Sequence, residues 1–104
     1  MNKTKLLSLL GLMRKAGKLI YGFDSAVEAL KNKKAVCLLY ASDVSEKTEK
    51  NLKYEAQKYG KDILKLEVTI EEAGSAIGKK AGVFALCDEG FMKALVELTA
   101  KKEN

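Results

Sequence analysis

Two short, wholly apolar runs constrain the fold of this chain more than any other feature. They read AVCLLYA at 35–41 and VFALC at 83–87, and both are rich in branched and aromatic residues. Continuous apolar runs of this length are typical of β-strands that are buried on both faces. Such strands need a layer of helices on each side of their sheet. The sequence therefore predicts an α/β protein, a three-layer α/β/α sandwich.

Helical spacing accounts for most of the remaining chain. Apolar residues recur at intervals of three and four from Leu6 to Ala16, which predicts a helix over 3–16 that ends at Gly17. The other expected elements are a strand over 19–21, helices over 24–32 and 45–59, a partly exposed strand over 63–66, a short helix from 69 to near 78, and a last helix that follows Asp88. We expect one domain over 1–104 with a central sheet of about four strands. The order of the strands stays open.

Polar residues at the predicted helix starts are interpreted as caps, because their side chains accept the unpaired N–H groups of a first turn. The candidates are Asp24 or Ser25 for the second helix, Asp43 or Ser45 for the third, Thr69 with Glu72 as a reciprocal capping box for the fourth, and Asp88 for the last.

Positive charge is concentrated near the start of the sequence. The formal net charge is +5, and residues 1–34 hold eight lysines and arginines against two acids, a balance of +6. Residues 35–104 hold eleven against twelve, a balance of −1. Such asymmetry is typical of a nucleic-acid-binding face. A solvated, lysine-rich surface is the alternative.

The leucine-rich start is not expected to be a signal peptide. It is interrupted by Ser8 and Gly11, ends in Arg14 and Lys15, and is followed by no small-x-small cleavage site. No apolar run approaches the ~20 residues that a membrane span needs. We therefore expect a cytoplasmic protein without a membrane partner.

Catalytic and metal-binding patterns are missing. The chain has no histidine, the commonest general base near neutral pH. Cys37 and Cys87 lie apart in apolar runs and are expected to be buried, reduced thiols. Residues 74–80 are similar to a phosphate-binding loop, but the glycine spacing is one residue short and Lys80 replaces the magnesium-binding hydroxyl. Asp43 is the best catalytic candidate, although capping is favoured. We expect no enzyme, metal, cofactor or small-molecule substrate.

Three stretches in this order carry a family resemblance. They are LLGLMRKAGKLIYGFDSAVEAL at 9–30, AVCLLYASDVSEKT at 35–48 and EEAGSAIGKKAGVFALCDEGF at 71–91. Together they resemble the kink-turn-binding ribosomal protein family of L7Ae and L30e, and more closely its bacterial YlxQ-type branch. The resemblance covers nearly the whole chain. It implies an α/β/α sandwich and a non-catalytic, ribosome-associated protein that binds structured RNA.

The resemblance also implies a binding site at the amino end of the second helix. In the family's kink-turn binders, the segment after the first strand reads Gly-x-Asn-Glu-x-x-Lys, and this helix end meets tandem sheared G·A pairs of the bent RNA. Gly22 matches that pattern. However, Asp24, Ser25 and Glu28 stand in place of Asn, Glu and Lys. Asp24 accepts but does not donate hydrogen bonds, and Glu28 places an anion where the family has a cation.

Kink-turn binders also carry an apolar loop before the last strand, which packs on a flipped-out nucleotide. This chain has Lys79, Lys80 and Ala81 there, which suit phosphate. The expected RNA-binding residues are Lys18, Gly22, Phe23, Asp24, Ser25, Glu28, Lys31, Lys79 and Lys80. The expected partner is structured, ribosomal RNA, a kink-turn or a variant of one, with ribosomal proteins as further candidates.

An alternative keeps the same face but changes its partner. The chain has then lost kink-turn recognition and works as a protein–protein interaction module on the ribosome or in RNA metabolism. Asp24 and Glu28 would pair with a basic protein. Phe23 has two possible roles: it stacks on an RNA base, or it acts as a hydrophobic staple for its helix.

Overall fold

The structure, a computed structural model, describes residues 2–100. Its elements are α1 (Lys3–Lys15), β1 (Leu19–Tyr21), α2 (Phe23–Lys31), β2 (Cys37–Tyr40), α3 (Glu46–Lys58), β3 (Asp62–Lys65), α4 (Ile70–Ile77), β4 (Val83–Leu86) and α5 (Glu89–Ala100). Every predicted helix and strand is present, with bounds close to those expected. No helix in this described range is long and apolar enough to cross a membrane.

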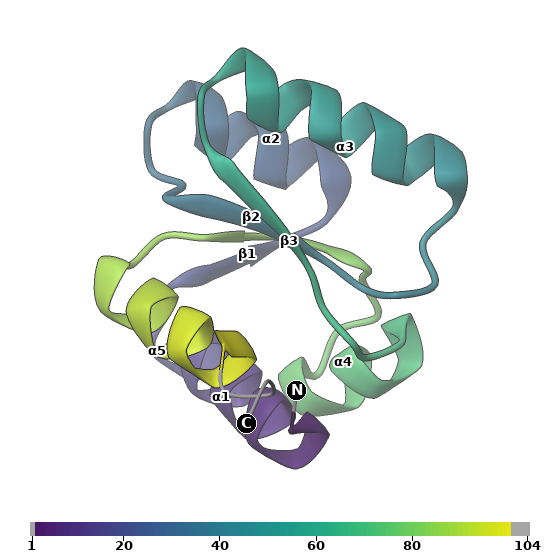
Figure 1. Ribbon diagram of the computed structural model, residues 1–104, viewed down its shortest axis with the longest axis vertical. Coiled ribbons are helices and arrows are strands. Elements are labelled where there is room, and N and C mark those ends of the chain that lie inside the picture. The colour runs from purple at the N-terminus through teal and green to yellow at the C-terminus, as the bar shows by residue number, and fades with distance from the viewer. Residues whose placement is uncertain (1, 101–104) are drawn as a thin grey trace.

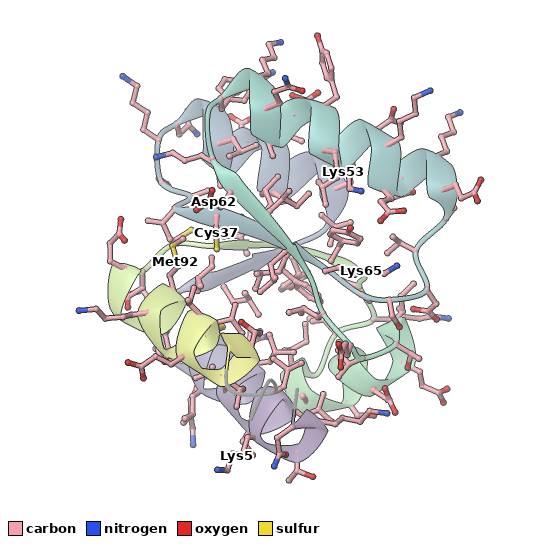
Figure 2. All side chains as sticks on the ribbon, in the orientation of Figure 1. Lys5, Cys37, Lys53, Asp62, Lys65 and Met92 are labelled. Carbon is pink, nitrogen blue, oxygen red and sulfur yellow. The ribbon has the colours of Figure 1, made fainter. Side chains whose placement is uncertain are left out.

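The four strands form one sheet in the order β1-β4-β2-β3. β2 pairs in parallel with β3, whereas β4 is antiparallel to both β1 and β2. The sheet therefore has two distinct ends. We call the end where β1, β2 and β3 finish and β4 begins the α2-entrance side, and the opposite end the α2-exit side. Figure 2 labels Asp62 and Lys65, which lie at the exit and entrance ends of β3.

Helices cover both faces of the sheet (Figure 1). α2 and α3 lie on one face, over a core that includes Ala26, Leu30 and Leu38. α1, α4 and α5 lie on the other, over a core that includes Leu10 and Phe84. Every residue of β2 and β4 is buried, as the apolar runs predicted. The expected three-layer α/β/α sandwich is confirmed.

Most helix caps follow the prediction. Ser45 caps α3 by accepting from the Thr48 N–H at 3.1 Å, and Asp88 accepts from the Phe91 N–H at 2.9 Å in α5. The capping box at the start of α4 is present. Asp43 also caps a helix, but a different one from that expected, because its Oδ1 accepts from the Ile70 N–H at 2.8 Å in α4. This bond gives Asp43 a structural role at the entrance side.

The two cysteines differ in burial. Both thiols are free, and Cys37 is buried, whereas Cys87 is only half-buried because it follows the last residue of β4. Cys87 therefore does not fit the predicted pair of buried thiols. Burial, aided by the negative charges of Asp62 and Glu89, raises the pKa of the Cys37 thiol to about 12. Figure 2 shows Cys37 beside Met92 and Asp62 at the exit side.

Two leucines of α1 provide a test of the packing. Leu10 is 0% exposed and Leu12 is 56% exposed, so Leu10→Ala and Leu12→Ala change helix propensity equally but differ in lost burial. Leu10→Ala is expected to lower the free energy of unfolding by ~2–5 kcal/mol through cavity formation. Leu12→Ala is expected to lower it by under ~0.5 kcal/mol. Urea denaturation measures both, and equal losses would contradict the observed packing of α1.

Candidate nucleic-acid interface

The turn from β1 into α2 places a glycine at the start of the helix. Gly22 is the N-cap residue, with φ 97° and ψ 144°, a backbone conformation that favours glycine. Its N–H donates to the Val83 carbonyl at 2.8 Å, and its own carbonyl accepts from the Ala26 N–H at 2.9 Å. The amino end of α2 is thereby held against the first residue of β4.

No side chain caps this helix end. The prediction that Asp24 or Ser25 would do so is wrong, because α2 begins at Phe23 and both residues lie within its first turn, too late to serve as N-cap. The first-turn N–H groups therefore have no capping side chain, and they carry the positive end of the helix dipole. Asp24 and Ser25 are exposed, whereas Phe23 is half-buried and packs on the core under α2 and α3.

The loop between α4 and β4 lies beside the α2 entrance. Lys79 and Lys80 are exposed and come shortly before Val83, the residue that accepts the Gly22 hydrogen bond. The Gly82 carbonyl accepts from the Ala41 N–H at 2.8 Å, which ties the same loop to the end of β2. The loop that carries these two lysines thus ends at the same edge of the sheet at which α2 begins.

Two glycines shape this loop. Gly78 has φ 79° and ends α4 in the left-handed conformation. A Cβ added at Gly74 would lie 3.2 Å from the Lys79 carbonyl oxygen, so the loop folds back closely on α4. The result is a shallow groove lined by Ile70, Glu71, Gly74, Ser75, Gly78, Lys79 and Lys80. Its two lysines provide positive charge suited to a polyanion.

A second groove follows the exposed face of α2. Its lining residues are Ile20, Asp24, Ser25, Glu28, Ala29, Asn32 and Lys34. Glu28 is exposed, and its Oε2 accepts from the Asn32 side-chain amide at 3.4 Å. Within residues 2–100, neither Asp24 nor Glu28 forms an ion pair. This groove is therefore acidic at the entrance side and basic only where it reaches Lys34.

The structure does not bring Lys18 and Lys31 to the α2 entrance. The Lys18 carbonyl accepts from the Cys87 N–H at 2.9 Å, and Lys31 is the last residue of α2. Both residues therefore belong to the α2-exit side. The nine residues of α2 separate that side from Gly22 by about 13 Å along the helix axis. The other seven expected residues lie at the α2 entrance, along α2 or in the Lys79–Lys80 loop.

Two polar contacts near the entrance side were absent from the sequence predictions. The guanidinium carbon of Arg14 in α1 lies 6.0 Å from the centre of the Tyr21 ring, just before Gly22. The Tyr40 hydroxyl donates to Glu49 Oε2 at 2.6 Å, which holds α3 to the end of β2. Burial, with the Glu49 hydrogen bond, raises the pKa of Tyr40 to about 12, and the same bond lowers the pKa of Glu49. No local sequence pattern links either pair.

Fold and surface together describe an α/β/α sandwich with an uncapped helix end beside a lysine-bearing loop. The sequence matches the ribosomal protein L7Ae/L30e/S12e/Gadd45 family over residues 4–96. The chain belongs to this family, and the family resemblance seen in the sequence is confirmed.

Curated relatives match most of the chain. The RNA-binding protein YlxQ of Enterococcus faecium is 36% identical over 97 residues, which cover 93% of each chain. The RNA-binding protein YlxQ of Bacillus subtilis (strain 168) is 33% identical over 91 residues, which cover 86% of this chain and 90% of that protein.

Solved structures share the fold. A protein with unknown function from Bacillus halodurans C superposes with a TM-score of 0.83 at 30% identity, over 91% of this chain and 96% of that one. The Giardia lamblia 15.5kD RNA binding protein superposes with a TM-score of 0.74 at 17% identity, over 96% of this chain and 86% of that one. At that identity, the second likeness shows the fold alone.

The conformation of Gly22 leads to a stability prediction. A Cβ added there meets no atom within 4 Å, so Gly22→Ala introduces backbone strain without a clash. We expect a loss of roughly 1–3 kcal/mol in the free energy of unfolding. Ser25→Ala, an exposed change in the same first turn, is the control and is expected to have little effect. If thermal and urea unfolding show the two variants to be equally stable, the positive φ of Gly22 is not required.

Proposed function

We propose that this protein is a non-catalytic RNA-binding protein that recognises structured, ribosomal RNA through the α2 entrance and the Lys79–Lys80 loop. The observation that carries the proposal is the Gly22–Val83 hydrogen bond, which joins the uncapped helix end to the strand that follows the Lys79–Lys80 loop. Family membership supports it, as do the names of two relatives, both called RNA-binding proteins. In this proposal the protein acts in the cytoplasm, where ribosomal RNA is found.

The chemistry of this surface matches the requirements of RNA binding. Unpaired N–H groups at a helix amino end bind phosphate oxygens, and the helix dipole favours negative charge there. Lys79 and Lys80 are exposed and neutralise phosphates, which releases condensed counterions. Asp24 and Ser25 are exposed in the first turn, where a carboxylate accepts from base amino groups and a hydroxyl donates or accepts.

The preferred RNA in this proposal is a variant of a kink-turn. Asp24 and Glu28 add negative charge to the α2 face, and neither has a cation partner within residues 2–100. Phosphates close to that face would be repelled, which disfavours the family's usual docking. Base edges that present amino donors to Asp24 fit better. Phe23 then supports the helix from the core side, where it packs, rather than stacking on a base.

A second candidate function is docking of a basic protein, such as a ribosomal protein. The observation that favours it is the groove along α2, in which Asp24 and Glu28 are exposed. Tight binding of a standard kink-turn that weakens steeply with salt supports RNA recognition. If standard and variant kink-turns both bind no more tightly than a random duplex, the protein partner is favoured.

Removal of the two loop lysines tests the RNA interface. Lys79→Ala combined with Lys80→Ala is expected to weaken binding to all RNA sequences, because phosphate contacts carry no sequence information. The slope of log affinity against log salt should become shallower by roughly 0.7–0.9 per lost contact. Fluorescence anisotropy across a salt series measures both quantities.

The matched control is Lys47→Ala with Lys50→Ala, which removes the same charge from exposed positions of α3. It is expected to leave the slope close to that of the wild type. An unchanged affinity and slope in the Lys79/Lys80 variant would remove this loop from the interface.

Charge reversal at Glu28 tests the docking mode. If α2 docks as in the family's kink-turn binders, Glu28→Lys is expected to raise affinity for a standard kink-turn, since it restores the family's cation. Glu46→Lys makes the same charge change at an exposed position of α3 and is the control. A neutral or weakening effect of Glu28→Lys, or an equal gain in both variants, would indicate another docking mode.

A further inference from the structure

α2 ends differently from the other helices that are followed by a left-handed residue. α1, α3 and α4 are followed by glycines with positive φ, Gly17 at 73°, Gly60 at 67° and Gly78 at 79°. α2 is followed by Lys33 at φ 61°, the one non-glycine residue with positive φ among residues 2–100. A side chain in this conformation is strained, since its Cβ crowds the following carbonyl oxygen.

The turn around Lys33 is otherwise a regular helix ending. The Lys33 N–H donates to the Leu30 carbonyl at 3.1 Å, and the Lys34 N–H donates to the Ala29 carbonyl at 2.9 Å. This pair of bonds forms a Schellman motif, which most often holds glycine where Lys33 lies. Glycine would therefore satisfy the backbone without strain, and the folding of α2 gives no reason for a lysine.

Lys33 belongs to a group of exposed lysines at the α2-exit side. We name Lys18, Lys31, Lys33 and Lys34 the exit lysines; all four are exposed. Hydrogen bonds from Cys87 N–H to the Lys18 carbonyl and from Val36 N–H to the Leu86 carbonyl place the starts of β1 and β2 on either side of the end of β4. Residues that are distant in the sequence thus share one surface.

The charges that influence the Cys87 thiol also place Lys18 and Lys34 at the exit side. Burial raises the pKa of the Cys87 thiol, whereas the positive charges of Lys34 and Lys18 act in the opposite direction. Both ammonium groups are therefore close enough to the same thiol to influence it. Lys18 and Lys34 thus both approach Cys87, although they belong to different segments.

The exit lysines have no neutralising partners. Within residues 2–100, none of the four forms an ion pair. Acidic side chains are present at the same end of the sheet, since Asp62 and Glu89 are exposed and close enough to Cys37 to influence its thiol, but none of those within residues 2–100 forms an ion pair with an exit lysine. Like charges gathered on one surface repel one another, so the group is unfavourable to the isolated fold. A strained lysine among exposed lysines without ion-pair partners points to an external anion as the missing partner.

We propose that the exit lysines form a second RNA contact, which binds the phosphate backbone of a stretch beyond the one held at the α2 entrance. This inference rests on the proposed function and extends it. The groove along α2 reaches from Asp24 at the entrance to Lys34 at the exit, and it joins the two contacts. Glu28 lies in this groove between the two contacts and repels phosphate, so the two backbone contacts are separate.

The key variant is Lys33→Gly, because it separates the effect on stability from the effect on RNA binding. Removal of the strained side chain leaves the melting temperature at or above that of the wild type. Loss of a phosphate contact weakens RNA affinity and reduces the salt slope by roughly 0.7–0.9. The probe is a fluorescein-labelled stem-loop containing a standard kink-turn with extended flanking stems, compared with a version trimmed to the kink-turn.

A combined variant with Lys31→Ala, Lys33→Gly and Lys34→Ala loses three phosphate contacts, so the salt slope is expected to fall by roughly 2–3 units. The matched control, Lys47→Ala with Lys50→Ala and Lys53→Ala, removes the same charge from exposed positions of α3. The proposal is supported if the exit variants weaken binding to the long RNA more than to the trimmed RNA while the control does not. It is overturned if the exit variants bind both RNAs as the wild type does, or if the control has the same effect.

The same assay separates this inference from the proposed function. If the Lys79/Lys80 variant loses affinity and the exit variants do not, the α2-entrance interface stands and the second contact is overturned. If the wild type shows no salt-dependent RNA binding, both are overturned.

Discussion

The hydrogen bond from Gly22 to Val83 connects the fold of this protein to its candidate interface. It forms because β4 lies between β1 and β2 and runs antiparallel to both. The first residue of β4 is therefore next to the last residue of β1, and the helix that follows β1 begins beside the loop that precedes β4. If β4 instead ran parallel to β1 and β2, the loop that holds Lys79 and Lys80 would lie at the opposite end of the sheet. The orientation of one buried strand thus determines which loop accompanies the amino end of α2.

Burial explains why so much of the architecture followed from the sequence. The apolar runs that contain β2 and β4 have no polar face, and a sheet with two apolar faces requires two helix layers. Strand order did not follow, because side-chain hydrophobicity carries no information about which strands pair. Long-range caps were missed for a related reason. Asp43 accepts from Ile70, which approaches it only when the end of β2 and the start of α4 meet in the folded chain.

The candidate interface was only partly predictable. The count of charged residues along the sequence showed that the first third of the chain is basic. It suggested that these basic residues lie on one surface. However, β1 and α2 each cross the sheet, so Lys18 and Lys31 return to the exit side while Gly22 stays at the entrance. The start of α2 was placed one residue late because an aspartate and a serine are better capping side chains than glycine. The positive φ of Gly22 identifies the true N-cap, and that angle is a property of the β1–α2 turn, where the Gly22 N–H reaches Val83.

The acidic start of α2 makes physical sense once helix stability and ligand binding are considered separately. Asp24 in the first turn and Lys31 in the last turn both complement the helix dipole, so this charge order stabilises α2. The same order opposes phosphate binding at the helix start, since Asp24 offsets the positive end of the dipole. A polyanion that approaches the entrance therefore needs cations outside α2 in addition to the N–H groups of the helix, and Lys79 and Lys80 are exposed in the loop before β4. Lys33 differs from Lys31 because its backbone conformation is strained, so helix stability explains the position of Lys31 but not that of Lys33.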